Sequence, residues 1–185
     1  PNVMLGYYNM PDETAKVLKD GWFHTGDIGR IDDQGFLYIT GRCKSVIVTK
    51  NGKNIYPEEV EYYLNDNPLV SESLVLGIQK DDDDETYINA QILPNIEAIT
   101  EYLKGAVPTK DEIKKIMSDI VASVNSKLPN YKHIKGFIIR DKEFEKTTTQ
   151  KIKRYGDNTK MMINNILYSM EVLRTFLEYK KIHHI

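Results

Sequence analysis

The chain has 185 residues, of which 41% are hydrophobic and 28% charged, proportions that are ordinary for a globular protein and exclude a disordered one. A formal net charge of -2 gives no basic footprint, which argues against a nucleic-acid partner. The single cysteine, Cys43, excludes an internal disulfide framework, and no apolar run reaches membrane-spanning length. The chain begins at Pro1 rather than methionine, so we expect a processed or excised piece of a longer protein.

The first part of the chain alternates helix and strand patterns with turn signals. Residues 6–18 predict a turn and a short helix, because a proline and two acidic residues stand near its start and Gly21 is typical of its end. Strand patterns at 28–31 and 36–40 enclose a short, aspartate-rich turn that is typical of a hairpin. We therefore expect a helix followed by an antiparallel strand pair.

A second hairpin signal is the pair Asn51-Gly52, which separates strand patterns at 45–49 and 54–56. Asn-Gly pairs are among the strongest local hairpin signals, because both residues tolerate a positive φ. A proline then opens a predicted helix over 57–65, whose first turn is acidic.

Longer elements are predicted in the second part of the chain. They are strands at 70–78, 86–93 and 136–140, and helices at 111–128 and 157–179. The apolar spacing of the last helix fits packing on its own domain or a short coiled-coil seam. Because strands and helices are interleaved irregularly, the predicted fold class from about residue 44 onward is α+β, with a short mixed sheet flanked by helices.

Three motifs distinguish the chain from a generic soluble domain. In chain order they are Trp22-Phe23-His24-Thr25-Gly26-Asp27-Ile28-Gly29, then Gly41-Arg42-Cys43-Lys44 with its continuation over 52–61, and a weaker motif over 145–154. Together they resemble the adenylate-forming superfamily, which comprises acyl-CoA synthetases, luciferases and the adenylation domains of peptide synthetases. The resemblance extends from about residue 6 to residue 154, and several long motifs in order are more specific than one short pattern.

The resemblance identifies two residues of these motifs as nucleotide-binding. Asp27 corresponds to the aspartate that binds the ribose of ATP and then of the acyl-adenylate, with its carboxylate accepting hydrogen bonds from both hydroxyls. Arg42 corresponds to an arginine that contacts the nucleotide near the domain junction. Outside their motifs, Asp27 would be interpreted as a turn residue and Arg42 as a solvated surface residue.

Two more residues take conformational roles from the same resemblance. Lys44 falls at the family's hinge, where a few residues absorb a domain rotation through their φ and ψ angles. Gly52 falls in the loop that lines the tunnel for the pantetheine arm of CoA after adenylation, where a side chain would obstruct the approach. Val48 stands where many relatives carry a lysine, so the resemblance transfers no role of that lysine in the thioester step.

The third motif supplies the candidate catalytic residue. The family pattern Pro-Lys-Thr-x-x-Gly-Lys-Ile-x-Arg aligns with residues 145–154, which places Lys151 at the catalytic lysine of adenylation. An ammonium there offsets the negative charge that develops when a carboxylate attacks the α-phosphate. Glu145 and Gln150 replace the family's proline and glycine, a departure that bears on the backbone of this loop. The alternative interpretation of Lys151 is a solvated lysine in a basic stretch.

The resemblance also implies a domain organisation. Residues 1–43 correspond to the β-rich C-terminal edge of a large N-terminal AMP-binding domain, and residues 44–185 to the small C-terminal lid domain. The acyl pocket and the phosphate-binding loop of the family belong to the N-terminal domain, which is therefore an expected partner. We expect the 185-residue chain alone to lack ligase activity.

The implied activity is that of an AMP-forming acid–thiol ligase. A carboxylic acid and ATP, with Mg2+, give acyl-AMP and pyrophosphate, and CoA then displaces AMP to form the thioester. Residues 48–59 resemble bacterial long-chain fatty acid–CoA ligases, which implies a fatty acid substrate and a cytoplasmic location, or one peripheral to the membrane.

Three alternatives stay open. The runner-up to the fatty acid–CoA ligase is an adenylation domain that loads a carrier protein, or an aryl-CoA ligase. A non-catalytic interaction module on the same scaffold is supported only by Glu145 and Gln150, and intact Asp27, Arg42 and Lys151 argue against it. The four histidines have no spacing typical of metal ligands, so the sequence predicts no metal-binding residue.

Overall fold

The structure is a computed structural model that describes residues 2–80, 83–154, 156 and 158. The chain divides into two compact units, Pro1–Glu59 and Val60–Ile185. The helix predicted over 157–179 lies outside the described residues, apart from Asn158. Among the helices that are described, none has the length and apolar character needed to cross a membrane.

The first unit opens with a helix and a tight strand pair. Helix α1 (Pro11–Val17) has its proline and two acidic residues in the first turn, where carboxylates favour the positive end of the helix dipole. Strands β1 (Leu18–Lys19) and β2 (Trp22–Phe23) then pair antiparallel.

The expectation that Gly21 ends this helix is wrong. The helix ends at Val17, and Asp20 and Gly21 have φ values of 51° and 79°. Two successive positive φ values are those of a type I′ hairpin turn, for which Asp-Gly is a preferred pair. Gly21 therefore lies in the turn that joins β1 and β2, a strand pair that the sequence patterns did not indicate.

Both predicted hairpins of the first unit are confirmed. Strand β3 (Asp27–Ile31) pairs antiparallel with β4 (Leu37–Arg42), and β5 (Ile47–Val48) pairs antiparallel with β6 (Asn54–Ile55). The turn Cys43–Ser45, a single 3-10 turn, connects the two hairpins in the chain.

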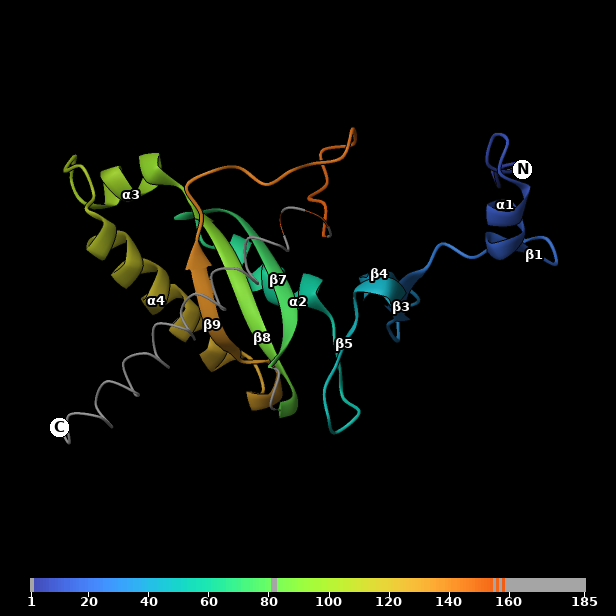
Figure 1. The fold of residues 1–185 in the computed structure, drawn as a ribbon, viewed down its shortest axis with the longest axis horizontal. Helices are drawn as coiled ribbons and strands as arrows, with labels where there is room; N and C mark the ends of the chain where they lie inside the picture. The colour runs from blue at the N-terminus through green and yellow to red at the C-terminus, as the bar shows by residue number, and fades with distance from the viewer. Residues whose placement is uncertain (1, 81–82, 155, 157, 159–185) are drawn as a thin grey trace, which may run out of the picture. The chain divides into compact units, whose positions relative to one another are not determined.

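The second unit is built on a three-stranded mixed sheet (Figure 1). Its strands are β7 (Val70–Lys80), β8 (Asp83–Pro94) and β9 (Ile134–Ile139), in the order β7-β8-β9. Strand β8 lies in the centre, antiparallel to β7 and parallel to β9, so the predicted mixed sheet and the α+β fold class are confirmed.

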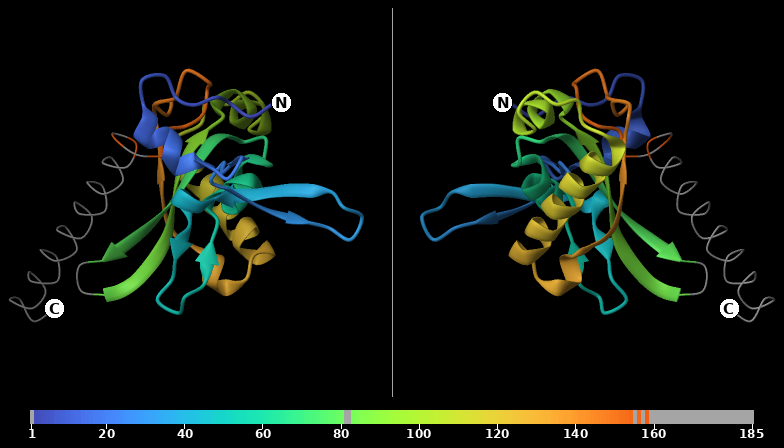
Figure 2. Two further views of the ribbon diagram at one scale, coloured as in Figure 1. Left: turned by 90° about the vertical axis from the view of Figure 1, so that its right-hand side faces the viewer. Right: turned by 90° about the vertical axis from the view of Figure 1, so that its left-hand side faces the viewer.

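Helices precede the sheet and connect its second and third strands. Helix α2 (Pro57–Asn65) matches its predicted bounds and buries Val60 and Leu64 completely. The chain then forms α3 (Ile96–Tyr102), which was not predicted. Helix α4 (Lys110–Lys127) packs against β8 and β9, as Figures 1 and 2 show.

The core of the second unit is formed by apolar side chains of the sheet and of α4. Those that are buried include Val70, Leu74, Val75, Ile88, Ala90, Ile92, Ile134, Met117, Ile120, Val121 and Val124. The start of α4 is fixed by a capping box between Thr109 and Glu112, in which each residue's side chain accepts a hydrogen bond from the other's backbone N–H.

Candidate functional site

The two predicted nucleotide-binding residues lie directly opposite each other on one hairpin. Asp27 begins β3, Arg42 ends β4, and the two residues are paired in the strand register. Arg42 Nε lies 2.9 Å from Asp27 Oδ1, and the backbone N–H of Asp27 donates to Thr25 Oγ1. A carboxylate has two oxygens with about four acceptor sites, so an ion pair through one oxygen leaves acceptor capacity for hydroxyl groups.

Lys44 lies in the 3-10 turn that follows β4 directly. The residue before the turn, Arg42, has extended dihedral angles, and the Cys43 N–H donates to the carbonyl of Gly26, which directly precedes β3. Lys44 is exposed, so its side chain tolerates a change in backbone direction without loss of core packing.

Gly52 lies at the tip of the β5–β6 hairpin with a φ of 71°. The Gly52 N–H donates to the carbonyl of Thr49 over 2.8 Å, and the Thr49 N–H donates to the carbonyl of Lys53 over 3.0 Å. This pattern is that of a three-residue hairpin loop with a left-handed residue at its end. A Cβ at Gly52 would have no atom of the described chain within 4 Å, so the space beside it is open.

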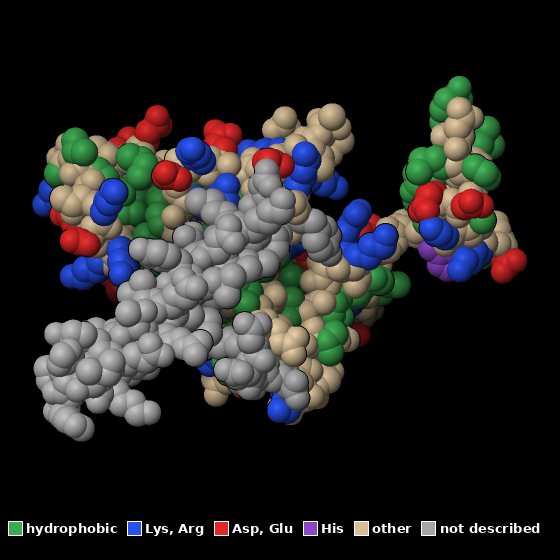
Figure 3. All heavy atoms as spheres, in the orientation of Figure 1, with side chains coloured by type: hydrophobic (Ala, Val, Ile, Leu, Met, Phe, Trp, Pro, Cys, Tyr) green, Lys and Arg blue, Asp and Glu red, His purple; other side chains and the backbone are tan. Residues whose placement is uncertain are grey.

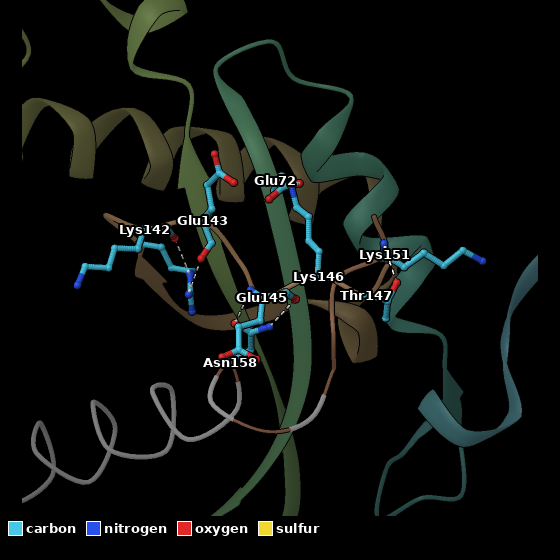
Figure 4. Close-up of polar contacts among 9 residues, drawn as sticks. Glu72, Lys142, Glu143, Glu145, Lys146, Thr147, Lys151 and Asn158 are labelled. Carbon is cyan, nitrogen blue, oxygen red and sulfur yellow. Dashed lines mark hydrogen bonds and ion pairs between the residues drawn. The ribbon is translucent and has the colours of Figure 1, made fainter. Parts of the chain in front are cut away.

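Lys151 lies in a second hairpin that has the same hydrogen-bond pattern. The Gln150 N–H donates to the carbonyl of Thr147 over 2.9 Å, and the Thr147 N–H donates to the carbonyl of Lys151 over 2.8 Å. Gln150 occupies the position of the family's glycine and has a φ of 62°. The substitution of this glycine therefore leaves the turn in place, and the exposed side chain of Lys151 points away from the neighbouring polar groups (Figure 4).

The candidate residues are divided between the two compact units. Asp27, Arg42, Lys44 and Gly52 belong to Pro1–Glu59, whereas Lys151 belongs to Val60–Ile185. The ion pair of Asp27 and Arg42 is the one pairing of predicted site residues that the described contacts show.

An ion pair that the sequence did not assign joins two of the motifs. Arg154, the last residue of the third motif, forms a bidentate pair with Glu61, at 2.9 Å to Oε1 and 2.6 Å to Oε2. Glu61 Oε1 also accepts the backbone N–H of Val75, on the sheet. Both charged residues lie within motifs named above. Because they are far apart in the sequence, the motifs did not predict that they contact each other.

A second ion pair lies at the start of the Lys151 hairpin. Lys146 Nζ is 2.7 Å from Glu72 Oε1, and both side chains are about three-quarters buried. The hydrogen bond with Glu72 raises the pKa of Lys146, because the bond stabilises the ammonium form.

A buried polar network was also missed. Asn158, Gln91 and Arg140 are respectively 1%, 0% and 7% exposed. Arg140 Nη1 donates to Gln91 Oε1, and Gln91 Nε2 donates to the carbonyl of Asn158. The Asn158 side chain lies beside the backbone of Glu145, as the dashed lines of Figure 4 show. The only sequence signal for this network is that polar residues interrupt the apolar pattern of the strands.

Within the described part of the chain, no group of three or more His, Cys, Asp or Glu residues is arranged to bind a metal ion. No residue of the described chain is therefore assigned as a Mg2+ ligand.

Known proteins are similar to this chain in sequence and in fold. The long-chain-fatty-acid–CoA ligase of Bacillus subtilis is 39% identical over 154 residues, which is 83% of this chain and 24% of that protein. The 2-succinylbenzoate–CoA ligase of Geobacillus sp. is 48% identical over 87 residues, 47% of this chain and 17% of that protein.

A solved structure of o-succinylbenzoate CoA synthetase from Bacillus subtilis, in complex with an acyl-adenylate intermediate, matches with a TM-score of 0.64 and 27% identity. The match covers 83% of this chain and 28% of that one. The chain thus spans less than a third of the length of these relatives.

A family model described as the AMP-binding enzyme C-terminal domain matches residues 44–157, which is most of the chain. The resemblance drawn from the motifs is thereby confirmed. The chain belongs to the AMP-binding enzyme C-terminal domain family and is related to adenylate-forming acyl-CoA and aryl-CoA ligases.

Proposed function

We propose that this chain is the C-terminal part of an ATP-dependent long-chain fatty acid–CoA ligase. The observation that carries this proposal is the geometry of the Lys151 hairpin. It keeps a left-handed turn at Gln150 and presents an exposed lysine directly after it. The similarity to a long-chain-fatty-acid–CoA ligase over 83% of the chain supports the choice of substrate class.

In the first step, a carboxylate oxygen of the fatty acid attacks the α-phosphorus of ATP. The bond from that phosphorus to the bridging oxygen of pyrophosphate breaks, which yields acyl-AMP and pyrophosphate. Two anionic groups approach each other in this step, and the ammonium of Lys151 offsets their repulsion by contacting both. Lys151 is the candidate catalytic residue because it is the one predicted site residue to which we assign a contact with the reacting groups.

In the second step, the CoA thiol loses its proton and its sulfur attacks the acyl carbon of the adenylate. The bond between that carbon and the phosphate oxygen breaks, and AMP leaves. A rotation about Lys44 withdraws Lys151 and brings the Gly52 hairpin to the adenylate. The open space beside Gly52 supports this role, since the pantetheine arm must pass close to the backbone.

Asp27 and Arg42 bind the nucleotide through both steps. The Asp27 carboxylate accepts hydrogen bonds from the ribose hydroxyls, and Arg42 fixes its orientation through the ion pair. Mg2+ enters with ATP, and the described residues contribute no ligand set for it, so no step is assigned to the ion.

The proposed domain boundary lies between residues 43 and 44, where the family model begins. The compact units divide later, after Glu59, because residues 44–59 form a small hairpin and the start of α2. Large apolar side chains before the boundary are exposed, among them Leu5, Tyr8, Trp22, Leu37 and Ile39, and hydrophobic side chains lie among charged ones on the surface around α1 (Figure 3). Such a surface is typical of a segment that packs against a larger domain.

The chain alone is accordingly proposed to be inactive. Neither the acyl pocket nor the phosphate loop of the family is found among its motifs. Turnover of fatty acid, ATP and CoA by the purified 185-residue chain would overturn this part of the proposal.

The two half-reactions test the proposed function in the full-length protein that contains this chain. Lys151→Ala should lower acid-dependent pyrophosphate exchange by about 100-fold, which is the usual cost of removing one stabilising group from a developing anion. Transfer from synthetic acyl-AMP to CoA should stay unchanged. The control is Lys142→Ala, an exposed lysine of the same segment. Equal exchange in the two variants would refute the role of Lys151.

A second candidate is an aryl-CoA ligase, because the 2-succinylbenzoate–CoA ligase of Geobacillus sp. shares 48% identity over part of the chain. Parallel assays with palmitate and 2-succinylbenzoate separate the two activities. A kcat/KM that favours 2-succinylbenzoate would replace the fatty acid assignment and leave the role of Lys151 unaltered.

A further inference from the structure

The hairpin that carries Lys151 has little internal structure. Beyond the turn hydrogen bonds between Thr147 and Lys151, its two legs are joined by one isolated bridge, between Lys146 and Ile152, and by Lys153. The Lys153 N–H donates to the carbonyl of Glu145 over 2.9 Å, and its Nζ lies 3.7 Å from Glu145 Oε2 in a half-exposed ion pair. An isolated two-stranded hairpin is marginally stable in water. The position of Lys151 therefore depends on what fixes the two legs.

Asn158 fixes both legs at once. Its side-chain Oδ1 accepts the Glu145 N–H over 3.2 Å, and its Nδ2 donates to the carbonyls of Glu145 and Lys153, over 3.2 Å and 2.8 Å. One amide group thus bonds to the backbone of the leg before Lys151 and of the leg after it. Only an amide supplies one acceptor and two donors in this arrangement.

The backbone of Asn158 is fixed in turn by the central strand of the sheet. Its carbonyl accepts from Nε2 of Gln91, on β8, and Arg140 donates to the other end of that amide over 2.7 Å. Arg140 also donates to the carbonyls of Lys142 and Glu143, over 3.1 Å and 3.2 Å. These two residues lead directly into the first leg, so one arginine orders the approach to the hairpin.

The second leg has a further attachment beyond Lys151. Arg154 forms its bidentate pair with Glu61 and donates to the carbonyl of Val75, over 3.3 Å. The Arg154 and Glu61 side chains are 18% and 13% exposed, so water competes little for either group. A forked arginine–carboxylate pair fixes orientation as well as distance.

Stability alone does not account for this arrangement. Buried polar groups cost free energy unless each is satisfied, and apolar side chains of similar volume often serve a fold equally well. Here the Asn158 amide bonds to the backbone on either side of one exposed lysine, and Arg140 and Arg154 attach the chain before and after it. A network of this kind fixes where the hairpin lies, which is what a catalytic lysine requires.

We propose that Asn158 and Arg154 are positioning residues for Lys151, which hold its hairpin in the geometry needed for adenylation and are dispensable for thioester formation. This proposal rests on the proposed function, because it takes Lys151 to act in the first half-reaction. Gln91 and Arg140 support Asn158 from the sheet, and Glu61 supports Arg154. None of these residues contacts the reacting atoms.

The test uses Asn158→Ala and Arg154→Lys in the full-length protein. Arg154→Lys keeps the charge but loses the forked pair with Glu61. Each variant should lower the kcat of pyrophosphate exchange by about 10-fold, since displacement of a catalytic group by about 1 Å costs up to 100-fold. The KM for ATP should stay within twofold, and transfer from synthetic acyl-AMP to CoA should be unchanged. An equal loss in both half-reactions would overturn the proposal, because it indicates general destabilisation.

A double-mutant cycle distinguishes a positioning role of Asn158 from a purely structural one. If Asn158 acts through Lys151, then Asn158→Ala should cause no further loss of exchange in a Lys151→Ala background. Multiplicative losses would refute the proposal. If Asn158→Ala does not fold, as judged by its thermal unfolding, the same cycle with Arg154→Lys decides the question.

The two proposals fail in different ways. If Lys151→Ala leaves exchange intact, the proposed function itself is wrong. If Lys151→Ala abolishes exchange but the variants at Asn158 and Arg154 do not lower it, the function stands and the positioning role is refuted.

Discussion

Two hairpins of this chain, at 49–53 and 147–151, have the same hydrogen-bond pattern but differ in the residue at the left-handed position. Each starts with threonine and ends with lysine, and in each the lysine N–H donates to the threonine hydroxyl, over 3.1 Å and 3.2 Å. The left-handed position before the lysine is Gly52 in one and Gln150 in the other, with φ values of 71° and 62°. The hydrogen-bond pattern therefore fixes the turn, and a side chain is compatible with it.

This difference indicates why glycine occupies the first hairpin. The backbone conformation alone does not require it, because Gln150 adopts the same conformation at a cost of about 1 to 2 kcal/mol. The remaining reason for Gly52 is the one proposed above, that the pantetheine arm passes through the open space beside it. Comparing the two hairpins thus distinguishes two reasons for a glycine: a backbone conformation with positive φ, and space beside the backbone for the pantetheine arm.

The largest expected effect comes from placing a side chain in the open space beside Gly52. Gly52→Asn and Gly52→Leu add side chains of similar size, but asparagine tolerates a positive φ and leucine does not. If space decides, both should slow transfer from acyl-AMP to CoA by at least about 10-fold, because a shift of about 1 Å in the reacting groups costs up to 100-fold. Pyrophosphate exchange should be unchanged in both. A Gly52→Asn variant with normal transfer would show that backbone conformation alone explains the glycine.

A smaller effect is expected from exchanging the residue at the left-handed position of the other hairpin. Gln150→Gly removes a left-handed penalty of about 1 to 2 kcal/mol, and the extra backbone entropy of glycine offsets about 0.5 to 1 kcal/mol of this gain. The net stabilisation should be about 0.5 kcal/mol or slightly more. Gln150→Val should destabilise, since a β-branched residue disfavours this conformation. Guanidinium unfolding of the chain measures both changes, and a stabilising Gln150→Val would contradict the comparison.

The smallest effect concerns the Lys146–Glu72 pair beside the second hairpin. The pKa of Lys146 is raised above its usual value of 10.5 by the hydrogen bond from its ammonium to Glu72. Its contribution to stability is thus fully present below pH 10.5 and is lost as pH rises through the raised pKa. The difference in thermal midpoint between the parent and Lys146→Met should be constant from about pH 7 to pH 9.5 and should shrink above pH 10.5. A difference that grows with alkaline pH would contradict this assignment.

Local signals in the sequence were sufficient for most of the fold. The Asn51-Gly52 hairpin, helix α2 and the strands of the sheet follow from patterns that act over a few residues. The failures were local as well. Gly21 signals both a helix end and a hairpin turn, and α3 is a short helix whose cap, Asn95, resembles a loop residue.

Sequence reasoning located only part of the candidate site. Motifs located Asp27 and Arg42, and the strand register of β3 and β4 brings them together. The ion pair of Glu61 and Arg154 joins residues 93 apart, and the hydrogen bond from Arg140 to Gln91 joins residues 49 apart. Such contacts are set by how the helix and the sheet pack, so no pattern along the chain encodes them.

The amide group of Asn158 also provides an intrinsic spectroscopic probe. Both of its Nδ2 hydrogens are directed at carbonyl oxygens, and the residue is 1% exposed. Side-chain amide hydrogens protected in this way exchange slowly with deuterated solvent and give separate NMR signals, whereas those of a solvated asparagine exchange fast. The lifetime of these two signals therefore reports how often the lysine hairpin detaches from the sheet, without any label or substrate.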